Sequence, residues 1–402
     1  MKSKLTVRKY ELKSWAAGLA LGATLWPAME AAHAQAVCTA VEVATGLVRP
    51  QGVAQSNLGN LIVGEAGPGT PNTGRISIVS PTGERRTLVS GLPSGRADVG
   101  DPSGPSGVVM RGRTLYLAVG IGDSILAGPM PRTAVANPAP SSPIFSSVLA
   151  IHFSARVERS TLGFALSLAD QQALALGQRV TLANGSGETL TLQLVANFPD
   201  WIPEPLPALA TNVRGSNPFD LAVVADQMFV TDGGRNLVWK VDAPTSSYAP
   251  LASFPNIPNP IFPVGPPSSE AVPTGITYQD GALMVTLLRG APFANGTSTV
   301  MAVDPSSGAQ SAYIGGLKTA IDTQQLRRGD ASTQLVLQHS YGPAPFFGGL
   351  GAVLRFDEPS GPAQVIDNCL SLPTAMAWDA KTGLLYVTEL ASGRLVSVAV
   401  RP

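Results

Sequence analysis

Residues 218–236 read PFDLAVVADQMFVTDGGRN, and this stretch decides the fold because variants of it recur along the chain. Each copy has a Pro, a variable residue, a small or acidic residue, an apolar pair, a tight turn and an apolar run that ends in a polar residue. Further copies begin at Pro50, Pro105, Pro273 and Pro373, and a weaker copy begins at Lys318. Repeats of short strands separated by Gly, Pro, Asn and Asp predict a β-propeller.

The spacing of the copies sets the number of blades. The same distance separates Pro50 from Pro105 and Pro218 from Pro273, while Pro273 to Pro373 is close to two such periods with the weaker copy between them. Only the interval from Pro105 to Pro218 is out of step, because it is longer by about one period. We interpret the extra chain as an insertion in the second blade, which predicts six blades; a disguised further blade, and so seven blades, is the alternative.

The expected architecture is therefore an all-β, six-bladed propeller over residues 37–402. The strand-like segment VCTAVEVATGL has no inner strand before it, and the last repeat stops after three strands, so we expect this N-terminal strand to complete the last blade. The insertion, residues 155–216, contains a capping-box helix start at Ser167 with a stop at Gly177. A hairpin turning at Asn184–Gly187 follows, and the helix and hairpin together form a small decoration or a lid.

Composition limits the class of protein. The 402 residues include 42 Gly and 35 Pro, only 13% are charged, and the formal net charge is zero. Because no basic stripe, phosphate-binding loop or RNA-type aromatic motif occurs, nucleic acid is excluded as a partner. A hydrophobic content of 44% also excludes a disordered chain.

Residues 1–34 have the pattern of a signal peptide. Basic residues precede a short apolar stretch, and two overlapping A-x-A sites predict cleavage after residue 34 or 36. The apolar stretch is short for a membrane span, and no later segment predicts one. We therefore expect a periplasmic or secreted monomer without a membrane anchor.

Few residues offer nucleophilic or transition-metal chemistry. His152 and His339 have no His or carboxylate at zinc-motif spacing, so we interpret both as strand residues. No G-x-S-x-G elbow is present. Cys38 and Cys369 could form one disulfide in an oxidising compartment. The strand alignment places Cys38 near the start of one outer strand and Cys369 near the end of its neighbour, so the bonded and the free state both stay open.

Repeat geometry gathers polar residues at one mouth of the central pore. In an antiparallel blade, the loop entering the first strand and the loop leaving the second lie on the same face. The entering loops contribute Gln51, Ser106, Asp220, Thr274, Thr319 and Thr374. The leaving loops contribute Glu65, Asp232, Arg235, Asn236, Arg289 and Glu389. We predict that a small molecule or a protein partner binds at this mouth.

Two readings of these polar residues stay open. Carboxylate, amide and hydroxyl oxygens are ligands that Ca²⁺ or Mg²⁺ accepts, and Asp220 with Glu65 is the candidate metal pair. The structural alternative is that the residues cap turns, with Asp232 bonding to the turn at Arg235.

The segments SNPFDLAVVADQMFVTDGGRNLVWKVD and PTGITYQDGALMVTLLRGAPFANGTSTVMAVDPSSG, with the early GNLIVGEAG and TGRISIVSPTGERRTLVSGLPSG, resemble the ScyD/ScyE family of exported bacterial β-propellers. The family is named for genes that accompany synthesis of the indolic sunscreen scytonemin. The chain is also similar in general to NHL-type and gluconolactonase-like six-bladed propellers, some of which bind a divalent metal in the pore. The resemblance supplies no catalytic residues.

Two classes of function remain. As a binding or scaffold protein, linked by the resemblance to secondary-metabolite biosynthesis, the chain would present its pore mouth to a ligand without bond chemistry. As a metal-dependent lactonase or a strictosidine-synthase-like enzyme, it would polarise a carbonyl or move a proton in the pore. The shortage of His and of clustered carboxylates favours the first class.

Overall fold

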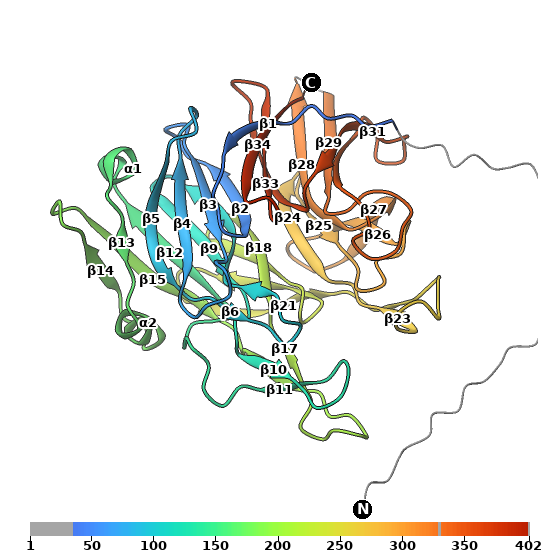
Figure 1. Cartoon of the computed structure of the whole chain (residues 1–402), viewed down its shortest axis with the longest axis horizontal. Coiled ribbons are helices and arrows are strands. Elements are labelled where there is room, and N and C mark those ends of the chain that lie inside the picture. The colour runs from blue at the N-terminus through green and yellow to red at the C-terminus, as the bar shows by residue number, and fades with distance from the viewer. Residues whose placement is uncertain (1–34, 329–330, 401–402) are drawn as a thin grey trace, which may run out of the picture. The chain divides into compact units, whose positions relative to one another are not determined.

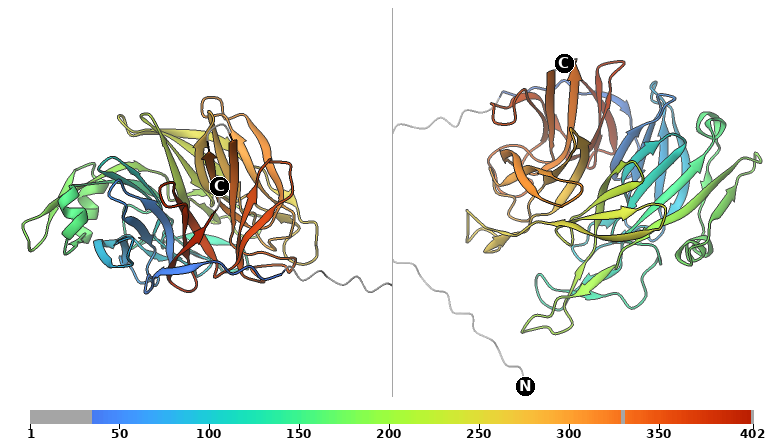
Figure 2. Two further views of the ribbon diagram at one scale, coloured as in Figure 1. Left: turned by 90° about the horizontal axis from the view of Figure 1, so that it is seen from above. Right: turned by 180° about the vertical axis from the view of Figure 1, so that it is seen from behind.

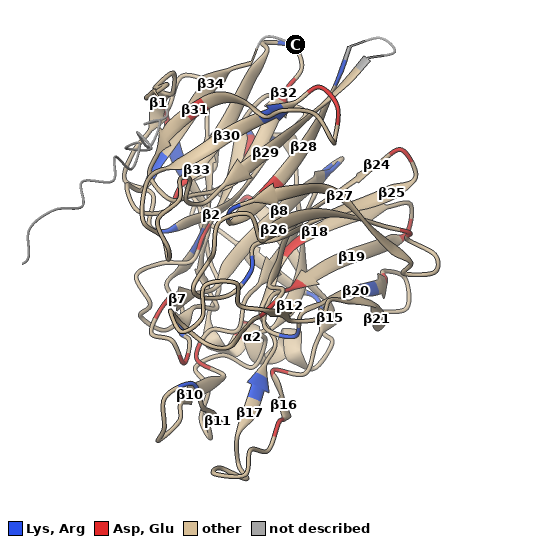
Figure 3. Cartoon of the chain, turned by 90° about the vertical axis from the view of Figure 1, so that its right-hand side faces the viewer, with Lys and Arg blue, Asp and Glu red and all other residues tan. Residues whose placement is uncertain are grey.

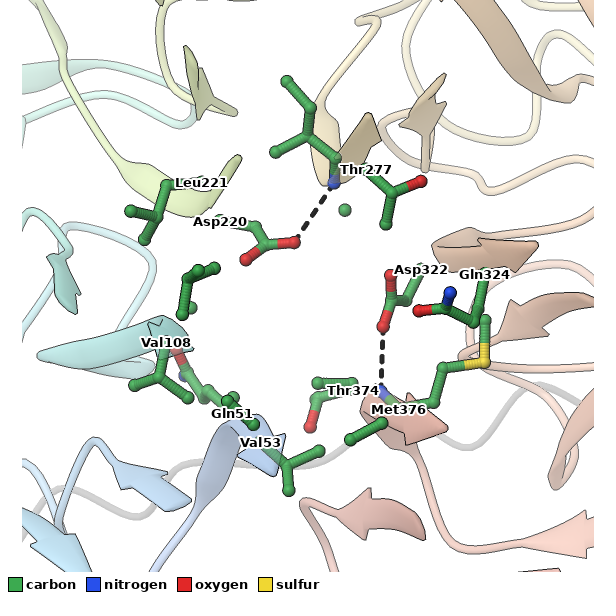
Figure 4. Close-up of a pocket in the computed structure, with 18 of the residues that line it drawn as sticks. Gln51, Val53, Val108, Asp220, Leu221, Thr277, Asp322, Gln324, Thr374 and Met376 are labelled. Carbon is green, nitrogen blue, oxygen red and sulfur yellow. Dashed lines mark hydrogen bonds between the residues drawn. The ribbon is translucent and has the colours of Figure 1, made fainter. Parts of the chain in front are cut away.

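The computed structural model describes residues 35–328 and 331–400, and the expected signal peptide, 1–34, lies outside these residues. In these residues six sheets of four or five strands follow one another along the chain, which confirms the six-bladed propeller. In Figure 4 the first strand of each blade faces a common central space. Among the described residues, no helix is long and apolar enough to cross a membrane.

Blades 1 to 3 hold the N-terminal half of the propeller. Blade 1 consists of β2 (Pro50–Gln55), β3 (Leu61–Glu65), β4 (Gly74–Val79), β5 (Arg85–Leu92) and β13 (Phe164–Ala165). Blade 2 consists of β8 (Pro105–Arg111), β9 (Thr114–Val119), β12 (Ser147–Phe153), β15 (Thr189–Asn197) and β14 (Val180–Ala183). Blade 3 consists of β18 (Pro218–Val224), β19 (Gln227–Asp232), β20 (Leu237–Asp242) and β21 (Ser247–Ser253).

Blades 4 to 6 have four strands each. Blade 4 consists of β24 (Pro273–Gln279), β25 (Ala282–Leu287), β26 (Ser298–Val303) and β27 (Gln310–Leu317). Blade 5 consists of β28 (Ala320–Arg328), β29 (Ala331–Gln338), β30 (Gly351–Phe356) and β31 (Gln364–Leu370). Blade 6 consists of β32 (Pro373–Asp379), β33 (Leu384–Glu389), β34 (Arg394–Ala399) and β1 (Val41–Ala44).

The ring closes as the sequence predicts. β1 pairs antiparallel with β34, with Val41 opposite Ser397, so the N-terminal strand is the outer strand of blade 6. Just before β1 the chain is bonded to blade 5 by a disulfide between Cys38 and Cys369. The Asp367 carboxylate also accepts hydrogen bonds from the Thr39 and Ala40 amides. The chain just before β1 therefore joins blades 5 and 6, and β1 covers the edge of β34 at the seam.

Blade 2 carries most of the extra chain. Between β12 and β15 lie α1 (Ala155–Ser160), β13, α2 (Leu168–Ala175) and β14. α2 has Ser167 as its N-cap in a capping box, as expected. β15, which lies inside the range 155–216, is the fourth strand of blade 2 and pairs with β12 along its length. Figures 1 and 2 show this decoration at the edge of the propeller, away from blades 4 and 5.

Paired short strands supply the remaining extra chain. They are β6 (Gly95–Arg96) with β7 (Pro102–Ser103), β10 (Ile125–Ala127) with β11 (Ala134–Ala136), β16 (Trp201–Pro203) with β17 (Val213–Gly215), and β22 (Ile257–Pro258) with β23 (Ser268–Ser269). The second strand of each blade is nearly all buried, as in VTD of β19 or YVTE of β33, because neighbouring blades cover both of its faces. In Figure 3 the acidic and basic residues are interspersed along the ribbon.

Candidate functional site in the central pore

The inner strands surround a central cavity of about 350 Å³. Along blade 1 its wall runs from Gln51 to Gln55, and along blade 6 from Thr374 to Trp378. The cavity therefore occupies the pore itself, from the second to the sixth residue of the inner strand. Of the residues predicted for the mouth, Gln51, Asp220 and Thr374 line it. Figure 4 shows these three side chains around the central space.

The residue at the third position of each inner strand determines whether that blade places a carboxyl group in the pore. Each inner strand starts opposite the end of the second strand, for example Pro218 opposite Asp232 and Ala320 opposite Gln338. Counted from these starts, the third residues in blades 1 to 6 are Gly52, Gly107, Asp220, Gly275, Asp322 and Ala375. Two blades thus place a carboxyl group where the other four have Gly or Ala.

The glycines make room for the two carboxyl groups. A Cβ on Gly107 would lie 2.3 Å from Asp220 Oδ1, and a Cβ on Gly275 would lie 2.8 Å from Asp322 Oδ1. Neither distance leaves space for a methyl group. Gly275 belongs to blade 4, between the two blades that carry the acids, so the two carboxyl groups flank it. We call Asp220 and Asp322 the pore carboxyl pair.

Each acid of this pair bonds to the next blade through the backbone. The Ile276 amide donates to Asp220 Oδ2 at 3.1 Å, and the Met376 amide donates to Asp322 Oδ2 at 2.8 Å. The Thr323 amide also donates to Asp322 Oδ1 at 2.7 Å. Among the described residues neither acid has an ion pair with Lys, Arg or His. Two carboxyl groups therefore lie in one pore without a basic side chain to neutralise them.

Burial without a counter-charge shifts both acids toward the neutral form. Burial raises the pKa of Asp220 to about 6. Burial, and then the charge of Asp220, raises the pKa of Asp322 well above its usual range. Because the two groups interact, they release their protons as a pair. The pore can thus both donate and accept hydrogen bonds close to neutral pH.

The rest of the cavity wall mixes amides with apolar side chains. Gln51, Gln55 and Gln324 lie on blades 1 and 5, while Val108 and Leu221 belong to blades 2 and 3. The hydroxyl of Thr374 is already used, because it donates to the Pro50 carbonyl at 2.9 Å. The Gln324 amide nitrogen also donates to the Gln325 carbonyl at 3.1 Å, whereas the Thr277 hydroxyl of the wall has no partner among the described residues. The carboxyl pair, this hydroxyl and the remaining hydrogen-bonding positions of the amides are therefore the polar groups offered to a bound molecule.

The acidic residues of the leaving loops have a structural role. We call Glu65, Asp232 and Glu389 the mouth carboxylates; all three are fully buried, and none of them lines the pore cavity. Arg75 donates to both oxygens of Glu65, with Nε 2.9 Å from Oε1, and the Val48 amide donates to Oε2 at 2.6 Å. Glu65 thus has its own partners and does not lie with Asp220 as the proposed metal pair.

Asp232 and Glu389 repeat this arrangement. Asp232 accepts from the Asn217 amide at 2.8 Å, the Arg235 amide at 3.0 Å and the Trp239 indole at 3.0 Å. Glu389 accepts from the Ser371 amide at 2.8 Å and from Arg394 Nε at 2.7 Å. Each mouth carboxylate therefore ties the chain that enters its blade to the end of the second strand, which is the structural alternative considered for Asp232.

The other predicted mouth residues bind neighbouring chain. Arg235 lies over the Trp239 ring, Asn236 accepts from the Val272 amide, and Arg289 donates to the Thr297 carbonyl. Ser106 donates to the Pro218 carbonyl, whereas Thr274 shares a hydrogen bond with Thr286. These side chains join turns and blades and do not line the cavity.

Sequence reasoning missed Asp322. The weaker repeat was aligned with Thr319 in the second position, whereas the structure gives that position to Ile321 and the third to Asp322. Thr319 is buried and donates to the Ser340 carbonyl. The signal that could have found Asp322 is the pair Ile321-Asp322, which matches Phe219-Asp220 in blade 3.

The histidines do not join the pore. His152 lies on β12 with Nδ1 2.8 Å from the Thr114 hydroxyl. His339 is buried, its Nδ1 is 2.9 Å from the Pro373 carbonyl, and burial lowers its pKa to about 4. The described residues contain no group of three or more His, Cys, Asp or Glu that could hold a metal ion.

No family model and no curated protein matches the chain. Among solved structures, a gluconolactonase from Xanthomonas campestris is 11% identical over 92% of this chain and 93% of that one, with a TM-score of 0.49. The PQQ-bound aldose sugar dehydrogenase from Streptomyces coelicolor is 14% identical over 90% and 97%, with a TM-score of 0.45. A protein of unknown function from Bacteroides thetaiotaomicron is 10% identical over 90% and 72%, with a TM-score of 0.47.

Likenesses of this strength carry no argument about activity. The assignment to the β-propellers rests on the strand order of the chain itself. The resemblance to the ScyD/ScyE family stays a prediction.

Proposed function

We propose that this protein binds a small polar molecule in its central pore, with the pore carboxyl pair as the recognition element. The observation that carries the proposal is that Asp220 and Asp322 flank Gly275 in one cavity and lack an ion pair among the described residues. A bound hydroxyl or ammonium group would donate to these oxygens and relieve the burial of their charge. The three glutamine amides of the wall would complete the hydrogen bonding.

The test uses one carbon skeleton in three charge states. Glucosamine, glucose and gluconate are titrated calorimetrically into the purified mature protein. We expect affinity to fall in that order, because an ammonium group gains and a carboxylate group loses against two acidic side chains. The variant with both Asp220→Asn and Asp322→Asn should lose the preference, while Asp242→Asn, which changes a partly exposed acid of blade 3 outside the pore, should keep it. Equal binding of the three compounds, or none, would contradict the proposal.

A divalent cation is the cofactor that the carboxylates could hold. Among the described residues two acidic groups line the pore, and each already accepts a backbone hydrogen bond. Ca²⁺ usually takes six to eight oxygen ligands, so the pore amides and water would have to supply most of them. Calcium titration of the parent protein and the same two variants tests this, because binding that is lost in the double variant and kept in Asp242→Asn would assign the ion to the pore.

Hydrolysis is the second candidate, and the raised pKa of the pair favours it. A carboxyl group with a pKa of about 6, as at Asp220, is suited to proton transfer near neutral pH. Such an enzyme would protonate a leaving oxygen with one acid and direct water with the other. Lactone hydrolysis followed by pH-stat tests it. If the parent protein hydrolyses a lactone and this turnover is lost in Asp220→Asn and Asp322→Asn, the protein is an enzyme rather than a binding protein.

Export to the periplasm or the medium is part of the proposal. It rests on the basic and apolar pattern of residues 1–34 and on the two A-x-A sites. From the resemblance to the ScyD/ScyE family we also propose a role linked to secondary-metabolite biosynthesis. Intact-mass measurement of protein from the periplasm should give a chain that begins at Gln35 or Val37; an uncleaved chain would overturn export.

A further inference from the structure

A second cavity lies at the mouth of the propeller. Its volume is about 350 Å³, and it shares no lining residue with the pore cavity. Inserted strand pairs form it, namely β6 with β7, β10 with β11, and β16 with β17, together with the loop after β19. Figure 1 shows β6, β10, β11 and β17 gathered on one side of the propeller. The cavity is therefore built from chain that the blades themselves do not need.

One wall of this cavity is apolar and tightly held. Ile121, Ile125 and Val213 are buried and pack together. A Cβ on Gly215 would lie 2.1 Å from Ile121 Cδ1, so the wall is in close contact with β17. Asn212 joins the inserted segments, since it accepts from the Ala134 amide at 3.0 Å and donates to the Glu204 carbonyl at 2.8 Å. The wall is thus formed before any ligand arrives.

The floor of the cavity contains one charged side chain, Arg214, that already has partners within the protein. Arg214 Nε donates to the Gly234 carbonyl at 2.6 Å. Its two terminal nitrogens each lie 3.3 Å from a carboxylate, one from Glu204 and the other from Glu270. Since its three guanidinium nitrogens are all engaged, Arg214 is a structural part of the floor.

Two opposite charges at the rim have no ion pair of this kind among the described residues: Arg132 is exposed to solvent, and the half-buried Asp98 accepts a hydrogen bond from the Val99 amide. Asp98 lies in the turn between β6 and β7, and Arg132 lies in the turn between β10 and β11; both line the cavity. Neither has an ion pair to another described residue, and they do not pair with each other. Burial raises the pKa of Asp98, as for a carboxylate that lacks a cation. A ligand with both charges would neutralise both side chains at once.

We propose that this cavity binds a small zwitterion with an apolar side chain, of the class of the aliphatic α-amino acids. Its ammonium group bonds to Asp98, its carboxylate bonds to Arg132, and its side chain packs on Ile121, Ile125 and Val213. Arg suits the carboxylate because its planar donors match the two oxygens. This inference does not depend on the function proposed for the pore.

The test removes each charge from the ligand and from the protein in turn. The probes are L-leucine, leucinamide, which lacks the carboxylate, and 4-methylpentanoate, which lacks the ammonium group. Calorimetric titration should show leucine binding about tenfold more tightly than either analogue, a difference of about 1.4 kcal/mol for one lost charge-assisted hydrogen bond.

Matched variants assign each charge to its partner. Asp98→Asn should weaken leucine about tenfold and leave 4-methylpentanoate unchanged, whereas Arg132→Gln should weaken leucine and leave leucinamide unchanged. Both side chains lie in turns, so these variants should fold. Asp220→Asn in the pore should bind leucine like the parent protein. The proposal is overturned if leucine gives no heat at millimolar concentration or if leucinamide binds as tightly as leucine.

Discussion

The pore carboxyl pair and the mouth carboxylates are both sets of acidic side chains on the first two strands of blades, yet their surroundings differ. Arg75 and Arg394 neutralise two of the mouth carboxylates, and backbone amides, hydroxyl groups or the Trp239 indole satisfy their oxygens. Asp220 and Asp322 have backbone amides and no basic side chain within reach among the described residues. Burial and a missing counter-charge therefore do not by themselves make an acidic residue a binding group, since Asp232 has no ion pair to a described residue either and is satisfied by four donors. The pore acids differ because they line a cavity and, within the described part of the chain, accept only backbone hydrogen bonds.

The two sets of acidic residues are expected to contribute to two different properties, stability and ligand binding. Groups that are fully paired in the folded chain stabilise it, because any loss leaves a partner buried and unsatisfied. Groups that line a cavity without a counter-charge and with few donors reduce stability and keep interaction energy available for a ligand. We therefore expect mutation of the first set to change unfolding and mutation of the second set to change binding.

The largest effect should come from a mouth carboxylate. Glu65→Ala leaves the Arg75 guanidinium, the Ser77 hydroxyl and the Val48 amide without their acceptor. We expect the free energy of unfolding to fall by about 3–5 kcal/mol, as when one partner of a buried pair is removed. Urea unfolding measures it. Glu84→Ala is the control, because Glu84 is 68% exposed beside Arg86. Equal losses in the two variants would erase the distinction between the two sets.

The pore carboxyl pair should affect how the free energy of unfolding depends on pH. The pKa of Asp220 is about 6 in the folded chain against 3.8 when free, so the folded state holds its proton more tightly. The contribution of Asp220 to stability is then largest below pH 4 and is lost as the pH rises through 6, by about 3 kcal/mol at most. In Asp220→Asn, where Asp322 remains, this decrease should become smaller in unfolding curves recorded between pH 4 and 7.

The control for this profile is an acid with the opposite shift. Hydrogen bonds from Thr245 lower the pKa of the partly exposed Asp242, so its contribution to stability is lost as the pH falls. Asp242→Asn should leave the decrease between pH 4 and 6 in place. A pH profile of Asp220→Asn that equals that of the parent protein would show that the pore acid is not held in its neutral form.

The small residues of the third position give a third test. A Cβ on Gly52 would lie 2.1 Å from the Ser106 carbonyl oxygen of the next blade. Gly52→Ala should therefore force blades 1 and 2 apart and lower the free energy of unfolding by about 1–3 kcal/mol. Gly185→Ala, where nothing lies within 4 Å of a new Cβ, is the matched control for thermal unfolding. Unchanged melting in both variants would mean that the blades are more loosely packed.

The smallest effect should come from one donor to a mouth carboxylate. Trp239→Phe keeps the ring that packs between Phe198 and Tyr248 and removes the indole donor to Asp232. Because Asp232 retains its backbone donors, we expect a loss of about 1–2 kcal/mol in the free energy of unfolding. Ligand binding in the pore should be unchanged. A change in binding would connect the mouth to the pore and weaken the separation of the two sets.

The repeat pattern made the fold predictable in some detail. The Pro-led copies identified five inner strands directly, and the missing inner strand ahead of Val41 predicted that β1 would complete blade 6. The capping box at Ser167 predicted the start of α2. These features depend on residues close together in the chain, where propensity and turn chemistry act.

The site was predictable only in part. Asp220 could be placed in the pore because it follows a well-marked strand start, whereas Asp322 could not, since Ala320 replaces the Pro that marks the register. Glu65 and Glu389 have the residue type of metal ligands. What makes them structural is the third strand of their own blades, which brings Arg75 and Arg394 to the carboxylates.

The sequence by itself determined the number of blades, the closure by the N-terminal strand and the gathering of polar residues at one end of the inner strands. Only the tertiary structure decided which acids are neutralised and which are left to the pore. The reason is the distance along the chain over which each property is set. The strand pattern is set by neighbouring residues. The charge state of a buried acid depends on groups within about 3–4 Å that come from distant parts of the chain. Asp220 and Asp322 lie in different blades, on either side of Gly275 in blade 4, and only closure of the ring brings them into one cavity.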